Sequence, residues 1–507
     1  MGSFWLRTNR WLVWFHRWAG IGLGAFFVAW FASGAVLLYV PFPSLTAHDR
    51  LARSEPVAGS RLTQGPGRAL SGVPNADSLQ LISVAGRPTY LAFPAAGPPI
   101  AVSGDDNPIS GLFSAQTART VAERFGRSSA QVVAGPIEYD QWIVHQHFDP
   151  FRPFYRVRMK DADGTDLYVS ARTGQVLQWT RGSERAWNWC GAVLHWIYFT
   201  PLRKSWSAWN QVVWWLSLAA LLASLAGTWL GIDRFVKVRA VNHSKWSPFR
   251  GWMRWHHVFG LFASAIVVVW IFSGWLSMDH GRLFSKGQPT EQLATRLQGI
   301  SLEQIARAVP DTLLRGLGPV SEIHFGAVAG RPFIAARGGP AAASRVIWLD
   351  TPGAAATAAI APSLLITGLQ AAWPEDSQIE RASTPAHDFY AVAESLDETA
   401  VPFQVGGSRL RVYVDSVTGK LLVVMDSSRR AYAWVYYAMH TFNFPALLGH
   451  PTTHAILVLV LLAIGLAFTC TGVVLGVQRL RKSFSNPLPV PLPSGDRPHR
   501  FARRSPP

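Results

Sequence analysis

Four stretches of the chain are long and apolar enough to cross a lipid bilayer, and they constrain the fold more than any other feature. They cover residues 18–40, 211–231, 258–278 and 455–477. A membrane-spanning helix needs about 20 predominantly apolar residues, and inside lipid only helices and closed barrels satisfy their backbone polar groups. We therefore predict four transmembrane helices. The composition agrees, since 49% of the 507 residues are hydrophobic and only 15% are charged.

The short segments that flank these spans carry an excess of Lys and Arg on one side, which marks the cytoplasmic side. These residues are Arg7, Arg10 and Arg17 before the first span, Arg234, Lys237, Arg239, Lys245, Arg250 and Arg254 between the second and third, and Arg479, Arg481 and Lys482 after the last. Both termini should then be cytoplasmic. A cleaved signal peptide is the alternative for the first span, but its apolar run is long for one and lacks a convincing small-residue cleavage site.

This topology predicts an alternation of membrane helices with larger outer segments. The expected divisions are 1–40 for the N-terminus and first helix, 41–206 for the first outer domain, 207–231 for the second helix, 232–257 for a basic cytoplasmic loop, 258–278 for the third helix, 279–450 for the second outer domain, 451–478 for the fourth helix and 479–507 for a cytoplasmic tail. Each outer domain should end in a short helix before the next span.

The chain also contains an internal repeat, seen as matching residues at two fixed offsets. At an offset of 240 residues, His16, Gly20, Trp30, Ser33 and Gly34 correspond to His256, Gly260, Trp270, Ser273 and Gly274. At an offset of 245, YVSARTG at 168–174 corresponds to YVDSVTG at 413–419, and Arg185, Trp189, His195, Gly227, Gly231 and Arg234 correspond to Arg430, Trp434, His440, Gly472, Gly476 and Arg479. We interpret the chain as a tandem duplication of helix, outer segment and helix.

Both halves begin on the same side of the membrane, so the predicted repeat is parallel, with its pseudo-two-fold axis along the membrane normal. Equivalent residues then lie at equal depth: His16 and His256 near the cytoplasmic face, His195 and His440 near the outer face. Ionisable side chains at membrane depth are usually functional, and imidazole is a common ligand of haem iron. We therefore predict that the four histidines are the axial ligands of two haem groups.

Small residues beside these histidines should leave room for a flat cofactor. Gly20 and Gly260 each follow a histidine by one helical turn and so lie on the same helix face. Gly34 and Gly274 lie 18 residues beyond those histidines on the same face, about 27 Å farther along the helix. We expect the first two glycines to pack against an inner haem and the last two against an outer haem.

Other interpretations of these positions stay open. Small residues at four-residue spacing also serve ordinary helix packing, and histidines at membrane borders are often interfacial. His257, which corresponds to Arg17 in the repeat, and His454, which has no partner in the first half, are weaker candidates as ligands. His145 and His147 alternate along one face of a possible strand and are weaker candidates for contact with a metal ion.

The outer segments have the pattern of an α+β fold. Strands are predicted at RPTYLAF (87–93) and RPFIAAR (331–337), and an amphipathic helix at SLEQIARAV (301–309). Both segments end on a strand, a Thr-Gly turn and a strand, at 168–177 and 413–424.

These terminal motifs, LYVSARTGQVL and VYVDSVTGKLL, resemble the end of the PepSY domain. The HRWAG motif with its later SG pair, and the LH pair at 194–195, resemble the helices of the PepSY-associated transmembrane family, also called iron-regulated membrane proteins. The resemblance covers nearly the whole chain except the C-terminal tail. It implies an α-helical membrane protein with four transmembrane helices as a tandem parallel repeat, plus two extracytoplasmic α+β PepSY-like domains.

The family is similar to ferric-siderophore reductases of the bacterial inner membrane, with their soluble domains in the periplasm. The resemblance implies two haem b groups on His16, His256, His195 and His440, and a ferric siderophore as the periplasmic substrate. Because no flavin or nicotinamide motif is present, electrons should come from quinol or a cytoplasmic reductase. Nothing in the sequence resembles a nucleic-acid-binding module.

Two other functions remain possible at this stage. The first is a non-catalytic PepSY membrane module that binds or regulates an envelope protein or peptidase, in which the histidines only pack. The second is a transporter, although the spans lack the charged pairs that ion coupling requires. Beyond His195, Arg203 and Lys204 are candidates to contact a haem propionate.

Overall fold

The computed structural model describes residues 2–73, 75–338, 344–351, 353–376, 378–383, 387–407 and 410–485. The chain divides into two compact units, which we describe one at a time. The helical unit contains the described residues up to 28, those of 222–265 and those from 464 onward, whereas the mixed unit contains those of 29–221 and 266–463. Every described strand lies in the mixed unit.

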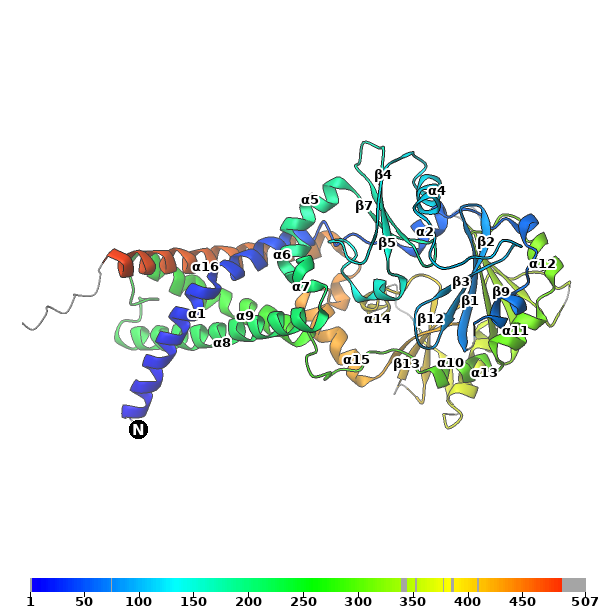
Figure 1. The fold of residues 1–507 in the computed structure, drawn as a ribbon. Coiled ribbons are helices and arrows are strands. Elements are labelled where there is room, and N and C mark those ends of the chain that lie inside the picture. Colours follow the sequence, from blue (N-terminus) through cyan, green and yellow to red (C-terminus); the bar gives the residue numbers. More distant parts are fainter. Residues whose placement is uncertain are drawn as a thin grey trace, which may run out of the picture. The chain divides into compact units, whose positions relative to one another are not determined.

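Four long helices carry the apolar stretches (Figure 1): α1 (Gly2–Leu37), α8 (Trp206–Val241), α9 (Gly251–Ser277) and α16 (Pro451–Ser485). Within them the stretches Thr8–Leu37, Trp206–Val241, Gly251–Ser277 and Pro451–Phe484 are long and apolar enough to cross a membrane. A helix satisfies its own backbone polar groups, which lipid requires. In the described part of the chain, the four predicted helices are therefore confirmed as long apolar helices at approximately the expected positions.

The helices extend beyond the apolar residues on which the prediction was based. Helix α8 continues to Val241, and α9 begins at Gly251, so only residues 242–250 connect them. The predicted loop at 232–257 was too long, because its basic residues favour a helix rather than ending it. Asp233 and Lys237 form an ion pair of 2.7 Å at i and i+4 in this extension, a spacing that stabilises helices.

The first four-stranded sheet of the mixed unit has the order β4-β5-β6-β7. Its antiparallel strands are β4 (Ala130–Ile137), β5 (Phe154–Met159), β6 (Asp166–Ser170) and β7 (Val176–Thr180). Helix α4 (Ala115–Gly126) buries Ala118, Ala122 and Phe125 against Val157 and Leu167 of this sheet. The predicted terminal strand, turn and strand are confirmed as β6 and β7.

A second four-stranded sheet has the order β11-β12-β13-β14. Its strands are β11 (Ile379–Arg381), β12 (Ala400–Val405), β13 (Leu410–Asp415) and β14 (Leu421–Met425). Helix α13 (Pro362–Ala372) buries Leu365 and Leu369 against Phe403 and Val412. The last two strands again match the predicted strand, turn and strand.

The third sheet joins strands from the two outer segments. Its six strands have the order β10-β9-β8-β1-β2-β3: β1 (Ala76–Val84), β2 (Arg87–Pro94), β3 (Ile100–Ser103), β8 (Glu322–Val328), β9 (Arg331–Arg337) and β10 (Arg345–Trp348). The central pair, β1 and β8, is antiparallel, with Leu79 opposite Phe325. The sequence predicted β2 and β9 but treated the two segments as separate, since pairing between distant strands leaves no local pattern.

A buried carboxylate lies where β1 and β8 meet. Glu322 is 1% exposed and accepts a hydrogen bond from Gln80 on β1 at 2.8 Å. It pairs with Arg50 at 2.5 Å and His324 at 3.0 Å. Burial alone would raise its pKa, but His324 and Arg50 hold the pKa of this carboxyl below its usual range. The buried charge of Glu322 thus has partners, as burial of a charge requires.

Short helices connect these layers. They are α2 (Ala47–Arg53), η1 (Gly59–Arg61), α3 (Pro66–Ser71), η2 (Gln146–Phe151), α5 (Gly182–Cys190), α6 (Ala192–Trp196), α7 (Thr200–Arg203), α10 (Glu291–Gln298), α11 (Leu302–Ala308), α12 (Asp311–Gly316), α14 (Phe389–Ala393), α15 (Ser427–Tyr432), η3 (Ala433–His440) and η4 (Pro445–Leu447). The predicted amphipathic helix is α11. Helices α6 and η3 are the predicted short helices before α8 and α16.

Candidate functional site

The inner pair consists of His16 on α1 and His256 on α9, both in the helical unit. Their imidazole ring centroids lie 6.3 Å apart, and the ring planes are inclined by 35°. The 240-residue offset had matched these two histidines with each other. The structure brings them together, at a distance that leaves space for one metal atom between the rings.

Hydrogen bonds fix which nitrogen each inner histidine presents. The Nδ1 atom of His16 lies 2.9 Å from the Ala223 carbonyl oxygen, which can only accept, so Nδ1 carries the proton. The Nδ1 atom of His256 lies 3.0 Å from Oγ1 of Thr471. That hydroxyl donates its one proton to the Phe468 carbonyl, so it accepts from His256. Both imidazoles therefore present the lone pair of Nε2.

A glycine faces each inner imidazole. A Cβ atom at Gly227 on α8 would collide with the ring of His16, and one at Gly472 on α16 would lie 3.3 Å from Cε1 of His256. Gly227 and Gly472 are the positions that the 245-residue offset matches. The two contacts are thus equivalent, and each lets a helix backbone approach an imidazole closely.

The outer pair consists of His195 on α6 and His440 at the end of η3, both in the mixed unit. Their ring centroids also lie 6.3 Å apart, and the ring planes are inclined by 63°. The segment η3 is a π-helix, a conformation that is frequent at functional sites. The ring of Tyr436 stacks on His440 at 5.9 Å.

Hydroxyl groups on the long helices orient the outer imidazoles. Ser33 lies 3.0 Å from Nδ1 of His195 and donates its own proton to the Trp30 carbonyl. Ser273 lies 3.2 Å from Nδ1 of His440 and likewise donates to the Trp270 carbonyl. Both hydroxyls therefore accept from Nδ1, and the two outer imidazoles also present Nε2.

Glycines again face the outer rings. A Cβ atom at Gly274 would lie 2.9 Å from Cε1 of His440, and one at Gly34 would lie 3.9 Å from Cε1 of His195. The inner and outer glycines differ in origin: the outer ones belong to α1 and α9, whereas those that face the inner rings belong to α8 and α16. The structure places Gly34 and Gly274 next to the predicted histidines.

The other two predicted glycines lie in different surroundings. Nothing lies within 4 Å of a Cβ atom at Gly20, so the space beside it is open. At Gly260 the same position is 3.0 Å from the ring of Phe468. Phe468 also stacks on His256, with ring centroids 4.9 Å apart. Phe468, on α16, therefore packs against both Gly260 and His256.

Two imidazoles at each site suit a metal whose remaining ligands come from a cofactor rather than from the protein. Structural metal ions such as zinc take about four ligands from the protein. Among the described residues, no group of three or more His, Cys, Asp or Glu side chains is arranged to hold a metal ion. Each site offers two imidazoles, which is the number that a haem iron takes as axial ligands.

The two weaker ligand candidates, His257 and His454, form other contacts through Nε2. His257 is buried, and its Nε2 atom lies 3.0 Å from the Gly231 carbonyl oxygen. The Nε2 atom of His454 lies 3.0 Å from the Thr441 carbonyl oxygen. In each of these two histidines Nε2 forms the hydrogen bond to the backbone, whereas in the inner and outer pairs Nδ1 forms the hydrogen bond.

The prediction that His145 and His147 lie on a strand is wrong. His145 precedes the 3-10 helix η2, which contains His147 and Pro150. Proline cannot donate to a strand ladder, and in this segment it lies in a tight helical turn. The rings of His145 and His147 are 5.4 Å apart, and the ring of Phe42 lies 4.9 Å from His145.

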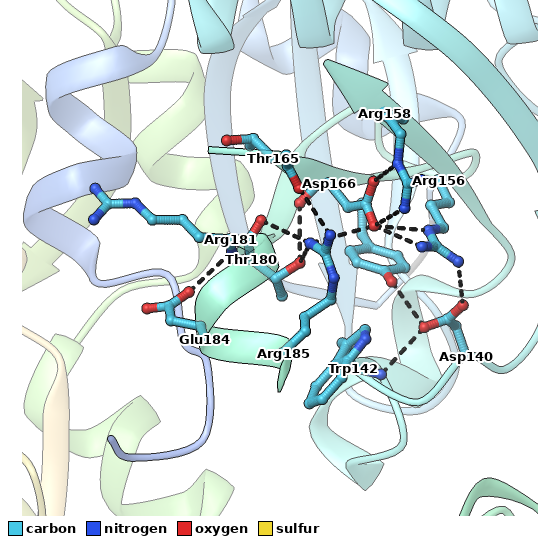
Figure 2. Close-up of polar contacts among 12 residues, drawn as sticks. Asp140, Trp142, Arg156, Arg158, Thr165, Asp166, Thr180, Arg181, Glu184 and Arg185 are labelled. Carbon is cyan, nitrogen blue, oxygen red and sulfur yellow. Dashed lines mark hydrogen bonds and ion pairs between the residues drawn. The ribbon is translucent and has the colours of Figure 1, made fainter. Parts of the chain in front are cut away.

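The charged residues of the first four-stranded sheet form a separate cluster around Asp166, whose side chain is fully buried (Figure 2). It pairs with Arg156 at 2.6 Å, Arg158 at 2.9 Å and Arg185 at 3.3 Å. Burial alone would raise the pKa of Asp166, but the hydrogen bonds from Arg158 and Arg156 lower it. The arginines are committed to this carboxylate, so the cluster is a structural one.

Asp140 and Asp388 have matching roles in the two four-stranded sheets. Asp140 accepts from the hydroxyl of Tyr168 at 2.7 Å, and Figure 2 shows its ion pair with Arg156. Asp388 accepts from the hydroxyl of Tyr413 at 3.0 Å. The two tyrosines are 245 residues apart, at positions that the repeat had already matched.

Sequence reasoning missed several residues that complete the sites. Ser33 and Ser273 appeared as matched positions without a role, whereas Thr471, Ala223 and Phe468 gave no signal of their own. Thr471 directly precedes Gly472, so proximity to a matched glycine was the one clue available. The partner of His16 is a backbone carbonyl, which no side-chain pattern reveals.

Comparison with known proteins supports the resemblance that the sequence motifs suggested. The chain matches the family described as PepSY-associated TM region over residues 13–333, which is more than half of its length. This range includes His16, His195 and His256 and ends before His440. No curated protein matches the chain significantly. The chain therefore belongs to the PepSY-associated TM region family.

Proposed function

We propose that the protein is a membrane oxidoreductase that holds two haem b groups and passes electrons across the membrane to ferric iron in a siderophore. The observation that carries this proposal is that one arrangement occurs twice. In the inner and the outer pair alike, the ring centroids lie 6.3 Å apart. All four imidazoles have Nδ1 in a hydrogen bond, which leaves Nε2 to bind a metal.

This separation fits two imidazoles on one iron atom. Metal–imidazole bonds of about 2 Å place the two nitrogens about 4 Å apart and the ring centroids about 6 Å apart. The hydrogen bonds at Nδ1 hold the rings in orientation and make Nε2 a better ligand. Bound haem would supply one-electron chemistry at each pair. The facing glycines permit the close approach of helix and ring.

The division of the chain supports a direction for electron transfer. The outer pair lies in the mixed unit together with every described strand, so this unit offers surfaces for a large substrate. The inner pair lies in the helical unit, where a quinol or a cytoplasmic reductase would deliver electrons. Each Fe(III) takes up one electron, so one quinol that loses two electrons and two protons reduces two ferric ions. The substrate itself is proposed from the family resemblance.

The test is a vesicle assay with the full chain reconstituted in known orientation. The haem groups are reduced chemically, and a ferric siderophore is then added with a ferrous chelator on the side of the mixed unit. We expect haem reoxidation coupled to formation of the ferrous chelate. His440→Ala should abolish this reaction, whereas the matched control His454→Ala should retain it, because His454 binds a backbone carbonyl instead.

Two results would contradict the proposal. If reduced haem stays reduced with every ferric siderophore but is reoxidised by a quinone, the electron acceptor is wrong. If the folded protein is colourless, the histidines only pack, and a non-catalytic membrane module becomes the better interpretation.

A further inference from the structure

Arg203, the last residue of α7, is a buried cation without a counterion among the described residues. Only 4% of the residue is exposed, and its Nε atom has no hydrogen-bond partner. Asp149, on the nearby helix η2, forms its ion pair with Arg152 instead, at 2.8 Å. The neighbouring Lys204 is exposed. Of the two basic residues in this segment, the structure singles out Arg203.

Two aromatic rings that are hydrogen-bonded to α6 hold the Arg203 side chain. Its guanidinium carbon lies 4.9 Å from the ring centroid of Tyr198 and 4.7 Å from that of Trp209. The amide of Tyr198 and the indole Nε1 of Trp209 each donate to a carbonyl of α6, at 2.9 and 2.8 Å. Helix α6 carries His195, so Arg203 is fixed next to the segment that positions the outer pair.

Among the described residues around Arg203, the nearby carboxylate of Asp149 is already paired with Arg152, and two histidines lie beside the Tyr198 ring. The ring of His145 lies 5.1 Å from that of Tyr198 and 5.4 Å from that of His147. Burial lowers the pKa of His145 to about 3, and the nearby His147 and Arg203 contribute to the shift. Burial also lowers the pKa of His147, although Asp149 opposes this. The cluster of Arg203, His145 and His147 therefore disfavours the binding of another cation and favours the binding of an anion.

A buried charge is costly unless an opposite charge pairs with it. The guanidinium group matches a carboxylate with two parallel hydrogen bonds. We propose that Arg203 binds a carboxylate that comes from outside the chain and lies beside the outer pair. That carboxylate is either a propionate of the haem on His195 and His440, which rests on the proposed function, or a carboxylate of the iron chelate, which does not require haem.

Three variants separate the charge and the shape of this group. Arg203→Met removes the charge, Arg203→Lys keeps the charge but not the planar fork, and Lys204→Met removes the neighbouring exposed charge as a matched control. All are made in a His256→Ala background, so that only the outer pair can retain haem. The His256→Ala protein is the parent of these variants. Haem with esterified carboxylates tests the parent protein directly, without any substitution at Arg203.

The first arm compares haem with its dimethyl ester, in which both propionates are neutral. Each is loaded on the outer pair, and its transfer to a haem scavenger is timed. If the carboxylate belongs to haem, the parent protein should retain natural haem at least about tenfold longer than the ester, because a charge-assisted hydrogen bond is lost. Arg203→Met should release both equally fast, Arg203→Lys should fall between, and Lys204→Met should behave like the parent.

The second arm titrates ferric citrate, a chelate with carboxylate groups, into the same proteins and follows tryptophan fluorescence. If the carboxylate belongs to the iron chelate, Arg203→Met should weaken binding at least about tenfold and leave haem release unchanged. Lys204→Met should have no effect.

An effect in either arm supports the carboxylate site and identifies its source. If neither natural haem nor ferric citrate depends on Arg203, the proposal is overturned. A protein that binds no haem would refute the proposed function alone, because the ferric citrate arm still decides whether Arg203 binds a carboxylate.

Discussion

The Oγ atom of Ser273 lies 3.2 Å from Nδ1 of His440 and donates its own proton to the Trp270 carbonyl. Its hydroxyl can therefore only accept from the imidazole, which fixes the tautomer. Ser33 holds His195 in the same way. A tryptophan backbone carbonyl is a second partner in both cases: Nδ1 of His440 lies 3.2 Å from the Trp270 carbonyl oxygen, and His195 has a backbone hydrogen bond with Trp30.

This arrangement predicts similar and limited effects of two serine substitutions. Ser33→Ala and Ser273→Ala should each weaken haem binding at the outer pair by less than the about 10- to 100-fold that follows loss of the partner that orients a metal ligand, because a tryptophan carbonyl still accepts from each imidazole. Haem loss to a scavenger measures both. A large loss in one variant and none in the other would argue against equivalent roles for the two serines.

The inner pair predicts a contrast between adjacent histidines. His256→Ala should remove about one haem per chain, because the ring of His256 lies 6.3 Å from that of His16 and its Nδ1 atom, rather than Nε2, bonds to Thr471. His257→Ala should leave the haem content unchanged, because its Nε2 atom is bonded to the Gly231 carbonyl. The haem-to-protein ratios of the purified variants distinguish these two outcomes. Haem loss in His257→Ala with retention in His256→Ala would assign the ligand to the other residue.

The glycines that face the inner rings predict a steric effect. Gly227→Ala should displace the imidazole of His16, because the added Cβ atom would collide with that ring. The absorption spectrum should then lose the contribution of one low-spin haem. Gly231→Ala is the matched control one turn along α8, where the Cβ atom would lie 3.9 Å from Leu261, an ordinary contact. A normal spectrum in Gly227→Ala would show that haem binding does not depend on the close approach of Gly227 to His16.

Asp166 predicts a pH-dependent contribution to stability. Asp166→Asn should lower the free energy of unfolding by about 3 kcal/mol at neutral pH, because three guanidinium groups lose their buried partner. The folded pKa of Asp166 is lowered, so its contribution is complete above the unfolded pKa of about 3.9 and disappears as the pH falls through the folded pKa.

The melting temperatures of the wild type and Asp166→Asn should therefore differ by a constant amount above about pH 5 and converge in more acidic solution. Asp163→Asn is the control, because that side chain is 66% exposed and its change should stay within about 0.5 kcal/mol. A difference that grows on acidification would contradict the lowered pKa.

The sequence predicted the long helices and the histidine pairs because both leave patterns that need no tertiary information. Apolar length identifies a membrane span, and the two offsets in the sequence match His16 with His256 and His195 with His440. The same offsets matched Gly227 with Gly472, which proved to face equivalent rings.

Other features depend on contacts between distant residues. The pairing of β1 with β8 joins positions more than 200 residues apart, such as Leu79 and Phe325, and no local pattern encodes it. His145 and His147 alternate as strand residues do, yet Pro150 favours the helical turn that forms. The burial of Arg203 results from rings of Tyr198 and Trp209 that close over it, whereas Lys204 beside it stays exposed.

The most direct test of the central claim is the haem content of the purified full-length protein, measured with its absorption spectrum. Two pairs of imidazoles that present Nε2 predict two haem b groups per chain, both low-spin with two histidine ligands. A folded protein that contains no haem, or whose haem content does not change when His16, His195, His256 and His440 are replaced, would contradict the account.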